Sequence, residues 1–230
     1  MEIVLVHGAY HGAWCWELLI PELERLGHTA HPVDLPISDP LLGAAAYAEI
    51  VGRAVDAAHQ PILVGHSIAG LVTPIVAATH PVSRLVFLAA LLPDPGRSAN
   101  DQRAAEPVDG RLPPKNPEWT DLGDDVWMVG PNTARELFFH DAPVQRAAWA
   151  TARLRAQAYR VMSEPTPLTV WPEVASDYII CRADRAVNPE WGRRAAHERL
   201  GVEAVEIDGG HSPFLTRPGE LARVLDSLVR

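Results

Sequence analysis

Short apolar runs rich in β-branched residues recur along the chain and predict the strands of one sheet. Between the first four runs, and after the last two, apolar positions recur with the spacing of helices. The runs lie at residues 2–6, 29–33, 61–64, 84–88, 177–181 and 203–207, and the helical patterns at 14–26, 41–58, 67–79 and 218–230. Strands that alternate with helices form a parallel sheet covered on both faces, so we predict an α/β fold with about six mostly parallel strands.

The alternation stops between residues 92 and 170, and we interpret this segment as an insertion into a core formed by residues 1–91 and 171–230. Nearly half of the 21 prolines fall in it, which argues against strands or long helices in its first half. Two helical patterns follow, at 133–143 and 144–160. Large aromatic residues in the segment either form a small core of their own or line an apolar pocket: Trp119, Trp127, Phe138, Phe139 and Trp149.

Charge and composition limit the kinds of molecule that the chain is expected to bind. The formal net charge is −9 and no cluster of Lys and Arg is present, so we expect a small-molecule partner rather than nucleic acid or a membrane surface. The first residues carry no basic segment and no apolar run reaches the roughly 18 residues that cross a bilayer, so we expect a cytoplasmic protein. Cys15 and Cys181 lie far apart, which favours reduced core thiols over a disulfide or a zinc site.

The stretch ILVGHSIAGLV, residues 62–72, predicts a strand that enters a helix through a sharp turn at Ser67. A serine at such a turn is held in a strained backbone conformation above the sheet. The residues two before and two after it must be small, because strand and helix nearly touch there. Gly65 and Ala69 meet this requirement, although glycine is usual at the second position. The alternative is an ordinary turn, where serine is common.

A nucleophilic serine requires a histidine base and a carboxylate that orients the histidine. In this architecture both follow the serine, the acid first, each after a later strand. Asp184 follows the fifth predicted strand and His211 lies in a glycine-rich loop after the sixth, so we predict Ser67, Asp184 and His211 as the catalytic residues. Asp94, after the fourth predicted strand, is the rival acid, whereas we interpret Asp208 as polarity at a strand end.

The reaction also requires two N–H donors for the negative charge that develops on the carbonyl oxygen. In sites of this type one is the backbone N–H after the nucleophile, here Ile68, and the other comes from the loop after the first strand, where we predict Ala9. Gly8 allows the backbone to approach closely at this point.

Three further histidines lie near these positions, namely His7, His11 and His66. Their spacing does not form a helical metal-binding face, so we predict no metal site. Residues of the loop after the first strand, together with the aromatic residues of the insertion, are the candidates for the substrate pocket: Gly8, Tyr10, His11, Trp119, Trp127, Phe138, Phe139 and Trp149.

Four stretches together resemble the α/β-hydrolase superfamily: VLVHGAYHGAWCWELLIPELERLGH, VDLP, LVGHSIAG and HSPFLTRPGELA. The resemblance is to the branch of plant methylesterases like salicylic acid-binding protein 2 and of plant hydroxynitrile lyases. It covers residues 1–93 and 176–230 and reaches the insertion only through ELFFHDAP. It implies an α/β-hydrolase fold with a cap over residues 92–170, the same three catalytic residues and no cofactor. Ala69, and the lack of a glycine after VDLP, depart from the family pattern.

The resemblance includes more than one chemistry. Hydroxynitrile lyases of this branch carry threonine or asparagine at the position of Gly8, and the threonine type adds a lysine at that of Ser212. Glycine leaves room for an ester carbonyl, so the resemblance favours a serine hydrolase that cleaves a small, largely apolar ester or lactone through an acyl-enzyme. A lyase-like or tailoring enzyme that uses the histidine for acid–base chemistry and a receptor with residual hydrolase activity stay open, as does a homodimer.

Overall fold

Six parallel strands form the main sheet, in the order β2-β1-β3-β4-β8-β9. The structure is a computed structural model and describes residues 1–106 and 108–228. The strands are β1 (Glu2–Val6), β2 (Thr29–Val33), β3 (Ile62–His66), β4 (Arg84–Leu88), β8 (Ser176–Cys181) and β9 (Val205–Ile207). The predicted α/β fold and its parallel sheet are confirmed, with each strand within two residues of its predicted bounds.

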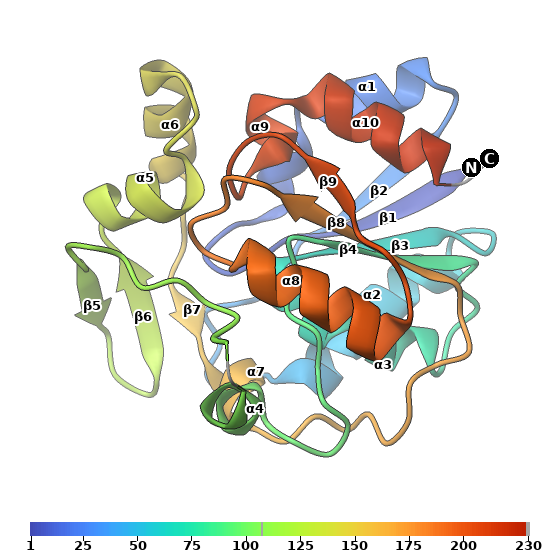
Figure 1. Cartoon of the computed structure of the whole chain (residues 1–230), viewed down its shortest axis with the longest axis horizontal. Helices are drawn as coiled ribbons and strands as arrows, with labels where there is room; N and C mark the ends of the chain where they lie inside the picture. The colour runs from blue at the N-terminus through green and yellow to red at the C-terminus, as the bar shows by residue number, and fades with distance from the viewer. Residues whose placement is uncertain (107, 229–230) are drawn as a thin grey trace.

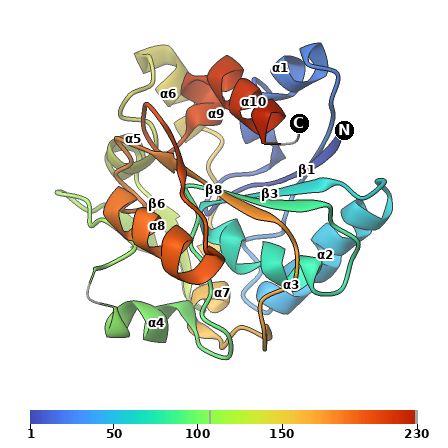
Figure 2. The same cartoon turned by 45° about the vertical axis from the view of Figure 1, so that its right-hand side comes forward.

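Helices cover both faces of this sheet (Figures 1 and 2). The helices α1 (Ile20–Arg25), α9 (Pro213–Thr216) and α10 (Pro218–Ser227) cover one face, and α2 (Ala44–Asp56), α3 (Thr73–Ala77) and α8 (Pro189–Ala195) cover the other. Because side chains alternate along a strand, Ile3 and Leu5 belong to the first apolar core and Val4 and Val6 to the second. The central strands β1, β3 and β4 are therefore apolar at most positions.

The predicted helices begin and end differently where proline interrupts them. Residues 14–26 divide into a 3₁₀ turn, η1 (Ala13–Trp16), and α1, with Pro21 in the first turn of α1. Residues 67–79 divide into η2 (Ser67–Leu71) and α3, again with a proline, Pro74, in the first turn. The last predicted helix ends at Ser227 as α10, and residues 229–230 of that prediction lie outside the described residues.

The inserted segment contains a second, antiparallel sheet, which sequence patterns missed. Its strands are β5 (Trp119–Asp121), β6 (Val126–Val129) and β7 (Gln157–Ala158), and its helices are α4 (Ala99–Ala105), α5 (Pro131–Phe138), α6 (Val144–Thr151) and α7 (Arg160–Ser163). The prediction of no strand in the first half was wrong, because the prolines precede β5 and a turn through Gly123, at φ +88°, closes a short hairpin. The helix predicted over 144–160 ends at Thr151, and β7 follows.

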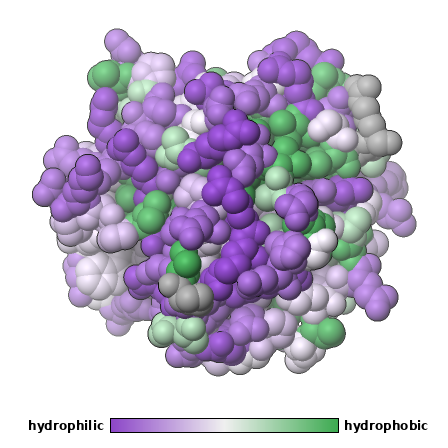
Figure 3. All heavy atoms as spheres, in the orientation of Figure 1, coloured by the Kyte–Doolittle hydropathy of each residue, from purple (hydrophilic) through white to green (hydrophobic). Residues whose placement is uncertain are grey.

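The remaining features of the chain concern its surface and its thiols. A π-helical turn, η3 (Ala196–Leu200), follows α8, and the surface over α8 is mostly hydrophilic, with apolar side chains in scattered patches (Figure 3). Within residues 1–106 and 108–228, no helix has the length and apolar character needed to cross a membrane. Cys15 and Cys181 are buried and free, in agreement with the prediction of core thiols.

Candidate active site

Ser67 lies at the sharp turn between β3 and η2. Its backbone φ is +56°, a left-handed value that residues with a side chain rarely adopt. The Leu91 N–H donates to Ser67 O at 3.0 Å and ties the turn to the segment after β4. The Ser67 side chain is partly exposed at the carboxyl edge of the sheet. Backbone strain at a strand-to-helix turn is the conformation that exposes a nucleophilic serine.

Small residues around Ser67 are required by close approaches of the backbone. A Cβ at Gly65 would lie 2.8 Å from Thr73 Cγ2, and one at Gly70 would collide with Leu91 O. Ala69 is buried, and its methyl group is accommodated in the packed turn. The closest approach of the turn to another segment therefore falls at Gly70, which explains how an alanine fits at position 69.

His211 and Asp184 are joined by a buried hydrogen bond. His211 Nδ1 donates to Asp184 Oδ2 at 2.8 Å, with side-chain exposures of 1% and 2%. The other carboxylate oxygen, Oδ1, accepts from Ala186 N at 2.7 Å and from Val187 N at 3.0 Å. These bonds fix the proton of His211 on Nδ1, so that Nε2 is the nitrogen able to accept a proton.

The other carboxylates considered from the sequence lie elsewhere. Asp94 is 40% exposed and pairs with Arg97 at 3.1 Å. Asp208 pairs with Arg182 at 2.9 Å on the surface. Among the residues that the structure describes, neither forms an ion pair with His211. The geometry therefore brings Asp184 alone of the three to the histidine.

His66 connects the turn at Ser67 to the loop of His211. Its Nε2 donates to His211 O at 2.9 Å, and the centres of the two imidazole rings lie 4.5 Å apart. Burial lowers the pKa of His66 well below its ordinary value, so the ring is neutral at pH 7. Within the described residues, no hydrogen bond joins Ser67 Oγ to His211. In structures without substrate, a hydrogen bond between a nucleophile and its base is often long or absent.

The loop after β1 is held by His7. The Leu35 N–H donates to His7 Nε2 at 3.0 Å, and His7 Nδ1 donates to Gly8 O at 2.9 Å. A ring that accepts at one nitrogen must be neutral, and burial lowers the pKa of His7 to about 4. Beyond Gly8, Ala9 lies with Ile68 in the wall of the cavity that contains Ser67. Both residues predicted to supply N–H donors therefore line the same cavity as Ser67.

His11 belongs to the same loop and is buried. Its Nδ1 donates to Ala9 O at 2.8 Å, and its ring stacks on Trp14 and packs edge-on against Phe139 and Phe214. Burial lowers the pKa of His11 to about 3. Within the described part of the chain, no group of three or more His, Cys, Asp or Glu side chains could hold a metal ion.

A cavity of about 200 Å³ opens at Ser67 and is lined mainly by apolar side chains. The core contributes Ala9, Tyr10, Ile68, Leu91, Ala186 and Val187, and the insertion contributes Arg103, Arg111, Leu112, Pro113, Pro114, Trp119, Leu137, Phe138, Tyr159 and Met162. A second, more open cavity of about 350 Å³ adjoins it and shares Tyr10, Arg111, Trp119 and Tyr159. Most of the wall around the serine therefore comes from the insertion.

The predicted pocket residues divide into three groups. Tyr10, Trp119 and Phe138 line the cavity at Ser67, and Trp127 lines only the adjoining one. The other four lie outside both walls, as far as the structure describes them: Gly8, His11, Phe139 and Trp149. Gly8 lies against the side chains of His66 and Ser67. His11 is buried against Phe139, which belongs to the apolar core, and the ring of Trp149 packs on Trp14 at 5.3 Å.

Several wall residues had no signal in the sequence. Arg103, Arg111 and Met162 lie in parts of the insertion with neither a motif nor regular periodicity. The pattern over 144–160 predicts a helix at Tyr159, but this residue follows β7, and its hydroxyl lies 2.7 Å from that of Tyr10. Only the packing of the insertion on the core reveals these contacts.

The insertion also holds the two loops that carry His211 and Asp184. His140 Nε2 donates to Ala183 O at 2.9 Å, and Asp141 Oδ2 accepts from Gly210 N at 2.8 Å. A Cβ at Gly210 would lie 2.7 Å from His140 Nε2 and 2.8 Å from Asp141 Oδ1. The glycine before His211 is therefore required by the close packing of the two insertion residues.

Comparison with known proteins gives consistent results. A model of the alpha/beta hydrolase family matches residues 3–224. The chain is 27% identical to Methylesterase 3 from Arabidopsis thaliana, covering 97% of this chain and 94% of that protein. It is 29% identical to Salicylic acid-binding protein 2 from Nicotiana tabacum, covering 97% and 95%. The crystal structure of polyneuridine aldehyde esterase matches with a TM-score of 0.84 at 23% identity, covering 100% and 99%.

Proposed function

The chain belongs to the alpha/beta hydrolase family, and on this premise we propose that it is a carboxylic ester hydrolase with Ser67 as nucleophile, His211 as base and Asp184 as the orienting acid. The observation that carries the proposal is the buried 2.8 Å hydrogen bond between His211 and Asp184 at the sheet edge where Ser67 lies. Relatives named as methylesterases support an ester as substrate.

In the proposed mechanism, Ser67 Oγ attacks the ester carbonyl while His211 Nε2 takes the hydroxyl proton. Asp184 stabilises the imidazolium through the bond to Nδ1. The tetrahedral intermediate collapses, and His211 returns the proton to the departing alcohol. Water, activated by the same histidine, then hydrolyses the acyl-enzyme and releases the carboxylic acid.

We assign the backbone N–H groups of Ala9 and Ile68 as the donors that stabilise the negative charge developing on the carbonyl oxygen. Both residues lie in the cavity wall with Ser67, and His7 holds the loop of Ala9 through Gly8. Donors fixed in advance stabilise the transition state without the cost of reorganisation. Glycine at position 8 supports acyl transfer rather than cyanohydrin cleavage, because the hydroxynitrile lyases of this branch carry a larger side chain there.

We propose a small, largely apolar ester or lactone as substrate and a cap function for residues 92–170. The cavity of about 200 Å³ has the size for such a molecule, and its walls include Leu112, Trp119, Leu137 and Phe138 from this segment. The segment therefore determines the shape of the space next to Ser67.

Covalent labelling and turnover test the proposal. A fluorophosphonate probe should label Ser67, located by peptide mapping, and methyl or p-nitrophenyl esters of graded size should be hydrolysed. Ser67→Ala should fold normally and lose ester turnover by roughly 10⁴- to 10⁶-fold, because the catalytic residues act as a unit. Turnover within tenfold of the unchanged protein, or labelling at another residue, would contradict the assignment.

Two aspartates provide a matched comparison for the acid. Asp184→Asn should impair turnover severely, because the amide cannot stabilise the His211 imidazolium. Asp94→Asn, at a surface residue paired with Arg97, should leave turnover close to normal. The reverse result would move the acid to the end of β4.

A further inference from the structure

The cavity at Ser67 contains one arginine in an unusual setting. Arg111 is half-buried and lines the wall beside apolar residues such as Leu112, Leu137 and Met162. Burial lowers the pKa of its guanidinium from the ordinary value, but the group stays charged at neutral pH. Holding a charge against apolar walls is costly unless a partner compensates it.

Arg111 has no such partner within the part of the chain that the structure describes. No carboxylate lies within ion-pair distance of its guanidinium, and the wall of the cavity at Ser67 includes neither Asp nor Glu. Arg103, the other arginine of this wall, is neutralised by Asp109 at 2.6 Å. Asp109 uses its second oxygen, at 2.9 Å, for the backbone N–H of Arg111 rather than for its side chain. Among the described residues of this wall, Arg111 is therefore the one charged side chain without an ion pair, although the Asp109 carboxylate nearby also acts on its charge.

The backbone at Arg111 is hydrogen-bonded to residues 186–187, the segment that orients Asp184. Arg111 forms an antiparallel bridge with Val187, and the flanking residue Leu112 donates its N–H to Ala186 O at 3.0 Å. The same residues, Ala186 and Val187, donate the N–H groups that hold Asp184 Oδ1. The position of Arg111 relative to the proposed catalytic residues is thus set by a few short backbone hydrogen bonds.

Two tyrosines add neutral hydrogen-bonding groups beside Arg111. The hydroxyls of Tyr10 and Tyr159 lie 2.7 Å apart, and both residues line the two adjoining cavities with Arg111. Burial raises the pKa of Tyr10 and of Tyr159, so neither carries a charge near pH 7. The Arg111 guanidinium and the two neutral hydroxyls line both adjoining cavities. Such donors together are typical of a carboxylate-binding site.

We propose that Arg111 binds a free carboxylate on the substrate, so that the preferred substrate is a half-ester whose ester group lies at Ser67 and whose second acid group pairs with the guanidinium. This inference rests on the proposed ester hydrolysis and specifies its substrate class. The planar guanidinium pairs with both oxygens of a carboxylate, and the surrounding apolar wall strengthens the pair.

Matched esters of one dicarboxylic acid test the inference. The ratio of kcat/KM for monomethyl adipate to that for dimethyl adipate is measured for the unchanged protein, Arg111→Gln, Arg111→Lys and Arg135→Gln. Arg135 is an exposed residue of α5 outside the cavity wall, so its variant removes the same charge from the surface of the insertion. Arg111→Gln should lower the ratio at least about tenfold, mainly through KM, Arg111→Lys should lower it less, and Arg135→Gln should not change it.

An unchanged ratio in Arg111→Gln, or an equal fall in Arg135→Gln, would overturn the inference. A binding measurement tests the inference independently of the proposed function. Calorimetry compares the binding of adipate to Ser67→Ala with its binding to the double variant Ser67→Ala, Arg111→Gln. If neither ester is hydrolysed, the proposed function fails, and the binding comparison still decides the role of Arg111. Adipate should bind at least about tenfold more weakly without the guanidinium, and equal binding would overturn the inference.

Discussion

Individual residues with left-handed backbone mark the edge of the sheet where the candidate site lies. Tyr10, Ser67 and Ala89 have φ values of +64°, +56° and +44°, and they follow β1, β3 and β4, three adjacent strands. Each such residue costs on the order of 1–2 kcal/mol. Strain concentrated after neighbouring strands is typical of functional sites, where it holds side chains and backbone N–H groups in fixed positions.

Gly8 offers a direct test at this scale. A Cβ there would lie 2.7 Å from His66 Nδ1 and 2.8 Å from Ser67 Cβ, so Gly8→Ala should displace the turn, and Gly8→Thr should displace it further. We expect ester turnover to fall roughly 10-fold or more, the scale seen when a preorganised donor is disturbed. In the control Gly219→Ala, the nearest atom is the flexible end of Glu22 at 3.2 Å, and turnover should be normal. Unchanged turnover in Gly8→Thr would contradict the assigned donors.

The buried histidines predict how stability depends on pH. His7 and His11 have pKa values lowered to about 4 and about 3 by burial, against 6.5 in the unfolded chain. Between pH 6.5 and about 4 the unfolded chain therefore binds more protons, so the free energy of unfolding should fall as the pH falls through this window. Each histidine contributes up to about 1.4 kcal/mol per pH unit to this slope.

His11→Asn isolates one of these contributions. The asparagine amide can replace Nδ1 as donor to Ala9 O but cannot take up a proton. Urea unfolding at pH 7, 5.5 and 4.5 should show a shallower loss of stability for the variant, by roughly 1 kcal/mol per pH unit. A slope identical to that of the unchanged protein would exclude His11 as a source of acid sensitivity.

At the scale of elements, the segment after α5 joins the insertion to the loops of Asp184 and His211, the proposed acid and base. His140 bonds to Ala183, next to Asp184, and Asp141 bonds to Gly210, next to His211. The loops are also joined to each other, since Ala183 N donates to Gly209 O at 3.0 Å. This segment falls within ELFFHDAP, and its contacts with both loops indicate a positioning role for His140 and Asp141.

Asp141→Ala should therefore lower kcat more than it raises KM, because the loop of His211 loses its anchor. A small displacement of a catalytic group costs up to about 100-fold, and we expect a loss between about 10- and 100-fold. Asp141→Asn retains an oxygen that can accept from Gly210 N and should restore most of the rate. Equal loss in both variants, or a loss confined to thermal stability, would contradict a positioning role.

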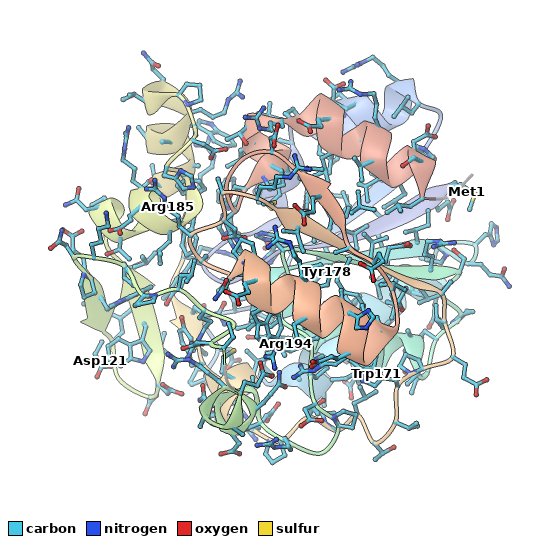
Figure 4. All side chains as sticks on the ribbon, viewed as in Figure 1. Met1, Asp121, Trp171, Tyr178, Arg185 and Arg194 are labelled. Atoms are coloured by element: carbon cyan, nitrogen blue, oxygen red, sulfur yellow. The ribbon has the colours of Figure 1, made fainter. Side chains whose placement is uncertain are left out.

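At the scale of the whole molecule, a buried carboxylate joins the insertion to the helices of the core. Glu106, after α4, is 9% exposed and pairs with Arg199 of η3 and, at 2.9 Å, with Arg194 of α8. It also accepts from Trp191 Nε1. Arg194 lies on the side of α8 that faces α4 (Figure 4). These ion pairs join the insertion to α8 and η3 of the core, so the stability of each part depends on the other.

Glu106→Gln should destabilise the whole protein, because Arg199 would lose its counter-charge and Arg194 would keep only the exposed Glu198, at 3.9 Å. We expect the free energy of unfolding in urea to fall by about 3 kcal/mol, as is typical when one partner of a buried pair is removed. In the control Glu203→Gln, the side chain is 92% exposed, and the change should stay within about 0.5 kcal/mol. A single transition of unchanged midpoint in Glu106→Gln would contradict this linking role.

The sequence alone determined those features that depend on local pattern. The apolar runs and helical spacings predicted the parallel sheet, because strand and helix periodicities are properties of short segments. The small residues around Ser67 predicted a tight turn for the same reason, and the chain order of Asp184 and His211 suggested their roles. The residues that resemble the family could likewise be recognised without a structure.

Only the tertiary structure decided the features that depend on contacts between distant segments. The pairing of His211 with Asp184 rather than Asp94 follows from where the loops after β8 and β9 meet. The small sheet of the insertion, and the placement of Arg111 in the cavity wall, follow from packing against the core. Such contacts leave no periodic signal in the sequence, because the free energy that selects them comes from burial and hydrogen bonds formed between segments far apart in the chain.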